Sequence, residues 1–225
     1  MKQQQLHIAL LGNPNSGKSS LFNVLTGLKQ KVGNFPGVTV DKKSGQSKIS
    51  ATLTANIIDL PGTYSLYPRR SDEWVAYNVM MNPGSTEKPE LYVLIVDASN
   101  LKRNLLFASQ VIDLKKPVVI ALTMMDIASK KGLKIDVQGL ERELGVPVIP
   151  VNPRKDKGIN ELKKAIDQTA RQLYKPPLRN FVAASNLSEA AIDDIKKIFP
   201  QISDYAAVHY LIHHESFALD APVQD

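Results

Sequence analysis

The sequence contains no cysteine, and it contains no hydrophobic run long enough to cross a membrane. Without cysteine the chain has no disulfides, thiolate metal ligands or thiol nucleophile, which suits a reducing cytosol. The longest apolar stretches, Leu91–Val96 and Val118–Leu122, have the length of buried strands. The first residues, Met1–Gln5, are polar, and no apolar signal segment follows them. We therefore expect neither a signal peptide nor a membrane span.

The chain is basic, but its positive charge is not concentrated. It has 28 Lys and Arg against 22 Asp and Glu, a formal net charge of +6. Such a balance is compatible with contact to nucleic acid or an anionic membrane. The cations occur in short separated pairs, such as Lys42–Lys43 and Lys115–Lys116, without a long run. We therefore expect solvated basic loops and no nucleic-acid partner.

Strand-like and helix-like segments alternate between residue 6 and residue 174, which predicts a parallel sheet covered on both faces. The expected strands are Leu6–Leu11, Gln46–Ala51, Leu53–Asp59, Leu91–Asp97, Val118–Thr123 and Val146–Val151. The expected helices are Lys18–Gly27, Asp72–Met81, Asn100–Lys115, Val137–Leu144 and Ile159–Tyr174. The second and third strands are too close for a helical crossover, so they should form an antiparallel hairpin at one edge. The expected fold class is α/β, with a six-stranded, mostly parallel sheet.

The pattern changes at Lys175-Pro-Pro-Leu178, where we place a linker. The chain then divides into a first domain over residues 1–174 and a linker with a partial all-α domain over residues 175–225. Two short helices are expected there, capped by Ser188 and Ser203. Their inward residues should be Ala191, Ile192, Ile195 and Phe199 in one, and Tyr205, Val208 and Ile212 in the other. Such helices must pack on the first domain, on a second copy, or on sequence outside this chain.

The most informative motif is Gly12-Asn-Pro-Asn-Ser-Gly17-Lys18-Ser19, which directly follows the first expected strand. The apolar residues after it repeat on one face of a helix; they are Leu21, Val24, Leu25 and Leu28. In a strand–loop–helix unit, backbone N–H groups and the helix N-terminus form an anion site. Lys18 can then reach the β- and γ-phosphates, and the Ser19 hydroxyl can ligate Mg²⁺. The sequence predicts a P-loop NTPase.

Two further segments are expected at the phosphate end of this site. Asp59-Leu-Pro-Gly62 ends a strand, so Asp59 can hold Mg²⁺ through water and the Gly62 N–H can bond the γ-phosphate. Residues 32–39 are polar, contain Gly and Pro, and have no clear period, which predicts a mobile loop. Thr39 can contact both Mg²⁺ and the γ-phosphate, and these contacts end when the phosphate leaves. A plain role opening a strand remains an alternative for Thr39.

A base-reading segment is expected at Thr123-Met-Met-Asp126. The Asp126 carboxylate can accept two N–H groups of guanine, a pattern that adenine does not offer. The segment resembles the Asn-Lys-x-Asp motif of guanine-nucleotide-binding proteins, except that Thr123 replaces the Asn. Those proteins usually carry a small Ser/Thr/Cys-Ala segment after the last strand, where this chain has Asn152 and Pro153. Pro153 has no N–H for guanine O6, so both base-reading elements depart from the pattern.

Four segments together resemble the N-terminal GTPase domain of the ferrous iron transport protein B family. They are residues 12–23, Val32-Gly-Asn-Phe-Pro-Gly-Val-Thr-Val40, Asp59-Leu-Pro-Gly-Thr-Tyr-Ser-Leu66 and residues 96–105. The resemblance spans residues 5–170. In that family a small helical domain follows, and then a membrane region that carries iron. The resemblance implies that residues 178–225 are an abbreviated helical domain, and that the membrane region of the same protein, at the inner face of a bacterial membrane, is the partner. A homo-oligomer is a further expectation.

The resemblance also implies slow, Mg²⁺-dependent hydrolysis of GTP to GDP. Members lack the water-orienting Gln after Asp-x-x-Gly, and Thr63 holds that position here. Related members use K⁺ in place of an arginine finger, held partly by the residue at Asn15, where it neutralises transition-state charge. A turn-forming role is the alternative for Asn15. The expected catalytic residues are Asn15, Lys18, Thr39 and Gly62.

The expected contacts to guanine nucleotide and metal extend over several separate segments. The nucleotide contacts are Gly12, Asn13, Pro14, Asn15, Ser16, Gly17, Lys18, Ser19, Ser20, Gly37, Val38, Thr39, Asp59, Gly62, Thr123, Met124, Asp126, Asn152 and Pro153. The metal ligands are Ser19, Thr39 and Asp59 for Mg²⁺, and Asn15 for K⁺.

Two other functions remain open. A ribosome- or RNA-associated GTPase is compatible with the basic charge and predicts salt-sensitive RNA binding, although no RNA-binding module is visible after residue 178. A non-hydrolysing nucleotide sensor is suggested by Thr123 and Pro153, and it would bind triphosphate and leave it intact.

Histidines gather near the C-terminus, where His209 and His213 have the i, i+4 spacing of a helical metal site, followed by His214. No convincing group of carboxylates completes such a site, so we expect solvated histidines at a helix end. The single tryptophan, Trp74, is expected to pack in the core.

Overall fold

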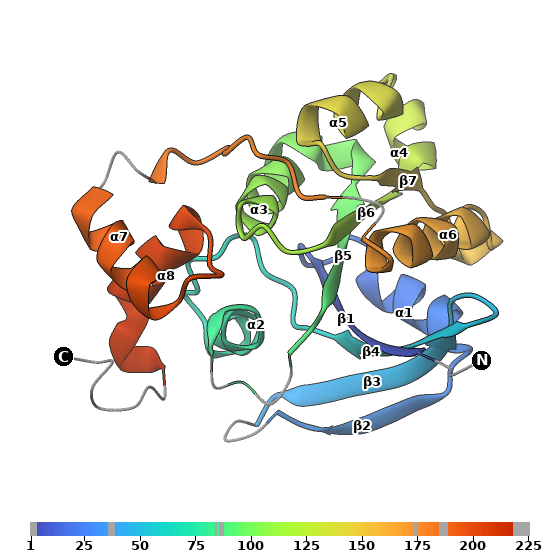
Figure 1. The fold of residues 1–225 in the computed structure, drawn as a ribbon. Helices are drawn as coiled ribbons and strands as arrows, with labels where there is room; N and C mark the ends of the chain where they lie inside the picture. Colours follow the sequence, from blue (N-terminus) through green and yellow to red (C-terminus); the bar gives the residue numbers. More distant parts are fainter. Residues whose placement is uncertain are drawn as a thin grey trace.

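The computed structural model describes residues 4–35, 39–83, 85, 88–172, 175–184 and 189–217, and its strands form one mixed sheet (Figure 1). The strands are β1 Gln4–Gly12, β2 Gln30–Asn34, β3 Asp41–Lys48, β4 Leu53–Asp59, β5 Leu91–Asp97, β6 Val118–Thr123 and β7 Val148–Pro150. The α-helices are α1 Lys18–Thr26, α2 Ser71–Met81, α3 Leu101–Asp113, α4 Met125–Lys130, α5 Val137–Leu144, α6 Ile159–Ala170, α7 Glu189–Ile198 and α8 Asp204–His213.

The order of the sheet is β2-β3-β4-β1-β5-β6-β7. Strands β4, β1, β5, β6 and β7 run parallel, and β3 pairs antiparallel with β4 as expected. The hairpin was expected at an edge of the sheet, but β2 pairs with the other side of β3 and forms that edge. The α/β fold class is therefore confirmed, but the sheet has seven strands and not six. The seventh, β2, lies partly in the segment expected as a loop, because all five of its residues are exposed and leave no apolar pattern.

Strand β3 lies earlier in the sequence than the strand expected before Leu53, at Asp41–Lys48 and not at residues 46–51. Its sequence is polar, and its backbone pairs with β2 on one side and β4 on the other. The position of β3 is set by these backbone hydrogen bonds, and its polar side chains show no alternating apolar pattern from which a strand could have been predicted.

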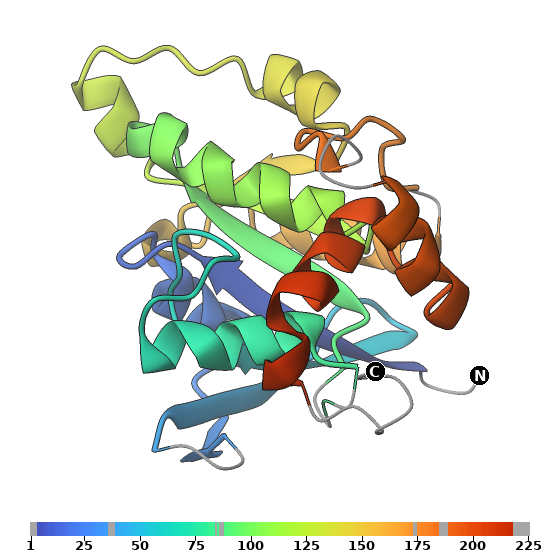
Figure 2. The ribbon, with the colours of Figure 1, turned by 90° about the vertical axis from the view of Figure 1, so that its left-hand side faces the viewer.

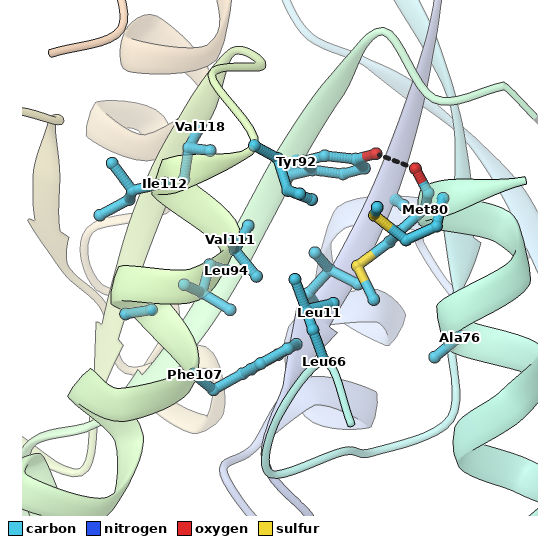
Figure 3. Close-up of a cluster of buried hydrophobic side chains, with 14 of the residues drawn as sticks. Leu11, Leu66, Ala76, Met80, Tyr92, Leu94, Phe107, Val111, Ile112 and Val118 are labelled. Atoms are coloured by element: carbon cyan, nitrogen blue, oxygen red, sulfur yellow. Dashed lines mark hydrogen bonds between the residues drawn. The ribbon is translucent and has the colours of Figure 1, made fainter. Parts of the chain in front are cut away.

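Side chains alternate between the two faces of the sheet and fill two hydrophobic cores. On β5, Tyr92, Leu94 and Val96 face one core, whereas Leu91, Val93 and Ile95 face the other. The first core lies under α2, α3 and α8, and Figure 3 shows Leu94 of β5 with Phe107 and Val111 of α3. The second lies under α1 and α6. The two cores hold the sheet from both faces, and the expected motifs lie at the carboxyl ends of its strands.

The expected helices are present, α5 over its expected range Val137–Leu144 and the others with at least one shifted end. Helix α1 ends at Thr26, because Gly27 adopts a left-handed conformation (φ +61°). Leu28, expected on the apolar face, lies beyond this cap and is 71% exposed, so that expectation was wrong. Helix α6 ends at Ala170, and the expected end at Tyr174 lies outside the described residues. Helix α4 was not expected, since six residues carry little periodicity.

The C-terminal helices pack on the first part of the chain, where α8 lies against α2 and α3 (Figure 2). The Ser203 hydroxyl accepts a hydrogen bond from the Ala206 N–H at 3.1 Å, as expected of the cap, whereas Ser188 lies outside the described residues. Tyr205 and Val208 are buried, but Ile212 is 52% exposed and was wrongly expected inside. The expected division at residues 174 and 175 stays a prediction. No helix in the described ranges has the length and hydrophobicity needed to span a bilayer.

Candidate nucleotide-binding site

The phosphate loop joins the end of β1 to the start of α1. Two of its residues have left-handed backbone conformations, Asn15 at φ +63° and Gly17 at φ +93°. The Ser16 N–H donates to the Asn13 carbonyl at 3.2 Å, which closes a tight turn inside the loop. The φ of Asn15 fits a turn role, and its exposed side chain on the cavity wall leaves its oxygen available to a cation.

A cavity of about 610 Å³ opens over this loop. The expected residues that line it are Asn13, Pro14, Asn15, Gly17, Lys18, Ser19, Ser20, Gly62, Thr123, Met124, Asp126, Asn152 and Pro153. One cavity thus joins the phosphate loop to both expected base-reading segments, although each of these segments lies over 100 residues after the loop in the sequence.

Other expected residues are outside the lining of this cavity. Gly12, Ser16 and Asp59 are buried and do not line it, and Gly37 and Val38 fall outside the described residues. Thr39 is exposed and does not line the cavity. Its expected contact with Mg²⁺ therefore stays a prediction.

At the phosphate end, the Lys18 ammonium forms an ion pair with the Asp59 carboxylate. Asp59 is only 8% exposed, so this charge pair is nearly removed from water. A carboxylate at Asp59 and a hydroxyl at Ser19 are oxygen donors of the kind that Mg²⁺ prefers. The donor set therefore fits Mg²⁺, and a phosphate would compete with Asp59 for Lys18.

The segment after β4 lies directly against the phosphate loop. The Thr63 N–H donates to the Gly12 carbonyl at 3.2 Å. A Cβ on Gly62 would lie 2.9 Å from the backbone nitrogen of Pro14, so only glycine fits. The segment is held from α3 as well, because the Arg103 guanidinium lies 3.7 Å from the centre of the Tyr64 ring. The Gly62 backbone is therefore held beside the phosphate loop, at the end of the cavity where the phosphates are expected.

Thr123 supports the phosphate loop from β6. Its hydroxyl donates to the Ser16 carbonyl at 2.7 Å and lies 3.2 Å from the Val96 carbonyl. The residue is 2% exposed, so this bond is shielded from water. Thr123 thus braces the phosphate loop from the position where the motif that the sequence resembles carries an Asn.

The base end is formed by the loops after β6 and β7. Asp126 lies exposed in the first turn of α4, and its Oδ1 accepts from the Ile127 N–H at 3.1 Å. Pro153 begins a short 3₁₀ turn, and Asn152 and Lys157 exchange backbone hydrogen bonds at 2.9 and 3.1 Å. Because Asp126 is exposed and, within the described residues, bonds only the neighbouring backbone, its carboxylate can accept further hydrogen bonds from a ligand in the cavity.

Buried polar atoms in the phosphate loop have no protein partner within the part of the chain that the structure describes. They are both amide atoms of Asn13 and the hydroxyl of Ser16. Buried polar groups are nearly always hydrogen-bonded in proteins, to protein or to a bound molecule. Of the two residues, Asn13 lines the cavity, so its amide is placed to bond a polar ligand at the loop.

Sequence reasoning missed five residues of the cavity wall, namely Arg70, Asp72, Ile127, Val151 and Arg154. It also missed Gly158, where φ is +77° and a Cβ would lie 2.1 Å from the Pro150 carbonyl oxygen. Gly158 follows the loop at the base end and fixes its path. In the sequence, the only indication of this role was that Gly158 directly precedes an expected helix.

The C-terminal histidines form no metal centre in the described ranges, which contain no group of three or more metal-ligating side chains. His209 is fully buried, so the expectation of a solvated histidine was wrong. Its Nδ1 lies 3.3 Å from the Tyr77 hydroxyl, and burial lowers its pKa to about 4. Trp74 packs against the first core, as expected.

Comparison with known proteins agrees with this site. A family model for ferrous iron transport protein B matches residues 6–166. The Fe(2+) transporters FeoB of Salmonella typhimurium and Escherichia coli K12 are each 44% identical over 169 residues, or 73% of this chain. The chain spans 21% of the length of these relatives.

Solved structures extend the likeness to the C-terminal helices. The cytosolic domain of T. maritima FeoB in GDP form I is 34% identical with a TM-score of 0.78, over 94% of this chain and 82% of that chain. The same domain in a GMPPNP form has a TM-score of 0.77 at 34% identity, over 92% and 81%. The cytosolic domain of L. pneumophila FeoB is 35% identical with a TM-score of 0.77, over 93% and 89%. The chain therefore belongs to the ferrous iron transport protein B family, with a G domain of the P-loop GTPase fold.

Proposed function

We propose that this chain is a Mg²⁺-dependent GTP-binding and GTP-hydrolysing switch that regulates the uptake of ferrous iron. The observation that carries the proposal is the single cavity that joins Lys18 and Gly62 to Asp126. A nucleotide with its phosphates on the loop places its base at the second end of such a cavity. The T. maritima relative has been solved in GDP and GMPPNP forms, and we extend guanine nucleotide to this chain.

At the phosphate end, the loop from Gly12 to Ser19 binds the phosphates through its N–H groups and Lys18. Ser19, Asp59 and Thr39 are the proposed ligands of Mg²⁺, which when bound shields the charge of the phosphate oxygens. The Gly62 N–H bonds the γ-phosphate. Because Gly62 already lies against the phosphate loop, this contact needs little movement of the chain.

At the base end, Asp126 accepts the two N–H groups of guanine. Pro153 offers no N–H to guanine O6, so we assign most of the selectivity to this carboxylate. Thr123 contributes indirectly, since its hydroxyl fixes the loop that binds the phosphates.

The finer features are slow turnover and stimulation by K⁺. Asn15 is the proposed K⁺ ligand, and a cation there adds positive charge beside the phosphates. We assign the positioning of the reactive water to the backbone of residues 32–39, and we assign no side chain as a general base.

In the whole protein we place this chain at the cytoplasmic face of a bacterial inner membrane, joined to a membrane region that carries iron. Residues 1–174 form the proposed G domain, and residues 175–225 the linker and a partial helical domain. The membrane region is the proposed partner, with a homo-oligomer as a second assembly.

The first test is a titration with fluorescent GDP and ADP side by side, in Mg²⁺ and K⁺ buffer. We expect tighter binding of GDP, and an Asp126→Asn variant that binds GDP about tenfold to a hundredfold more weakly, since charged hydrogen bonds are lost. Asp136→Asn is the matched control, because Asn also caps α5 at this exposed site. Equal binding of GDP and ADP would contradict the assignment.

The second test measures a single turnover of GTP. Thr39→Ala should keep GDP binding and lose most hydrolysis, and Asn15→Ala should lose the advantage of K⁺ over Na⁺. A wild-type chain that binds GTP and leaves it intact would instead support a nucleotide sensor. Salt-sensitive binding of RNA would support an RNA-associated GTPase.

A further inference from the structure

A second cavity, of about 280 Å³, lies at the other end of the strands from the nucleotide site. Two of the lysines that line it, Lys88 and Lys116, stand shortly before β5 and β6, at the amino ends of these parallel strands. The nucleotide cavity is lined by residues that follow the carboxyl ends of β1 and β6. The second cavity is therefore separate from the proposed nucleotide site.

The wall of this second cavity combines apolar surface with positive charge. Its apolar part includes Met80 of α2 and Ala206 of α8, so the first part of the chain and the C-terminal helices both contribute to it. Its charged side chains are Lys88, Lys115 and Lys116, and no acidic side chain lines it within the described residues. A molecule in this cavity would meet positive charge and an apolar wall together.

The ammonium of Lys116 lies among buried, uncharged groups. Its Nζ donates to the Met80 carbonyl at 3.4 Å and lies 3.3 Å from the Tyr92 hydroxyl oxygen. Tyr92 is fully buried, and its hydroxyl donates to the same carbonyl at 3.5 Å (Figure 3). Lys116 as a whole has exposed surface, but burial of its ammonium end, followed by the nearby charge of Lys88, lowers its pKa.

Two of the three lysines have no acidic partner. Among the residues that the structure describes, no carboxylate forms an ion pair with Lys88 or Lys116. Lys115, by contrast, pairs with Asp113 at 3.3 Å and donates to the Arg179 carbonyl at 2.7 Å. Two positive charges beside an apolar wall disfavour each other, and an anion bound in the cavity would compensate them.

We propose that this cavity binds a small organic anion, with a phosphate or carboxylate group on Lys116 and Lys88 and an apolar body against Met80 and Ala206. The cavity is at the lower end of the roughly 300–1,000 Å³ of ligand pockets, which favours a free small molecule over a whole lipid. Because α2 and α8 both contribute to the wall, the bound anion would join the C-terminal helices to the first part of the chain.

The test is a calorimetric titration of the whole chain with hexyl phosphate, which carries an anionic group and a short apolar body. We expect saturable binding that Lys116→Gln weakens at least tenfold and Lys88→Gln severalfold, since charged hydrogen bonds to the phosphate are lost. A Gln at position 116 can still donate to the Met80 carbonyl, so the fold should be kept. Lys164→Gln is the matched control and should bind as the wild type does, because Lys164 is exposed on α6 and lines neither cavity.

A second readout locates the bound molecule without any variant. Hexyl phosphate should slow amide hydrogen exchange in α8 and at the end of α2, because the ligand would contact both helices. Exchange in the phosphate loop, residues 12–19, should stay unchanged. Slower exchange confined to the phosphate loop would instead place hexyl phosphate in the nucleotide cavity and would contradict the inference.

Hexanol and inorganic phosphate test the two halves of the ligand separately. Each should bind at least tenfold more weakly than hexyl phosphate, and equal affinity of either would contradict a combined site. Vesicles of phosphatidylglycerol distinguish a lipid headgroup from a free anion: Lys116-dependent binding to vesicles without affinity for hexyl phosphate would assign the lysines to a membrane surface. The inference is overturned by that result, by a wild-type chain that does not bind hexyl phosphate, or by wild-type affinity in Lys116→Gln.

Discussion

Acid should destabilise this fold through a single buried histidine, His209. The residue lies on α8 and is fully buried, and the ring centres of Tyr67, Tyr77 and Tyr205 lie within 6 Å of its own. Burial, and to a lesser extent the nearby His213, lowers its pKa from 6.5 to about 4. In the fold His209 is therefore mainly neutral above its pKa of about 4.

The sign of the effect follows from proton linkage. The unfolded chain takes up a proton at His209 as the pH falls below 6.5, whereas the folded chain does so only near pH 4. Stability is therefore retained above pH 6.5 and is lost as the pH falls toward 4. The loss is about 2 kcal/mol at pH 5 and about 3 kcal/mol below pH 4.

The measurement is urea unfolding at pH 7.5 and pH 5, followed by the fluorescence of Trp74, the only tryptophan. His209→Phe keeps an aromatic ring in the site and removes the titration. Its stability should fall about 2 kcal/mol less than that of the wild type between the two pH values. Carboxylates and His213 titrate in both proteins, so their contributions cancel in the comparison.

His214→Gln is the matched control, because His214 is exposed at the end of the same helix. It should show the pH dependence of the wild type. Tyr77 and Tyr205 are neutral over this pH range, because tyrosine loses its proton only near pH 10 and burial raises these two pKa values further. Equal pH dependence of the wild type and His209→Phe would refute the reasoning.

Two further substitutions test the walls of the cavity. Thr123→Val removes a buried hydroxyl and leaves the Ser16 carbonyl without its donor, so urea unfolding should show a loss of about 1–3 kcal/mol in stability, together with weaker GDP binding. Thr123→Ser should retain the stability and the GDP affinity of the wild type. Wild-type stability in Thr123→Val would contradict the bracing role. Gly158→Ala should destabilise the chain by several kcal/mol, about the scale of severe backbone strain, because its Cβ would overlap a carbonyl oxygen. Gly132→Ala, with similar φ and open space around it, should cost only about 1 kcal/mol, and equal losses for the two glycines would contradict the steric argument.

The fold class and the phosphate site could be predicted from the sequence because their signals are local. The phosphate loop, its preceding strand and its following helix lie within about twenty residues, and a strand–loop–helix unit of this kind has few alternatives. Asp59 and Gly62 were likewise placed by the end of an apolar strand. Parallel strands bring such ends to one edge of a sheet.

Other features could not be predicted, because they depend on contacts between distant residues. The hydroxyl of Thr123 bonds a carbonyl 107 positions earlier in the chain, so the sequence showed only a departure from a motif. Strand β2 is exposed along its whole length and is placed by backbone pairing with β3. Neither contact leaves a pattern in the side chains.

The sequence by itself determined the alternation of strands and helices apart from β2 and α4, together with the phosphate loop and most of the apolar faces that build the cores. Only the tertiary structure decided that His209 is buried, that Ile212 is exposed and that Arg70 lines the cavity over the phosphate loop. The physical reason is that periodicity shows which residues share a face of a helix. Which face is covered depends on the elements that pack against it, and these come from elsewhere in the chain.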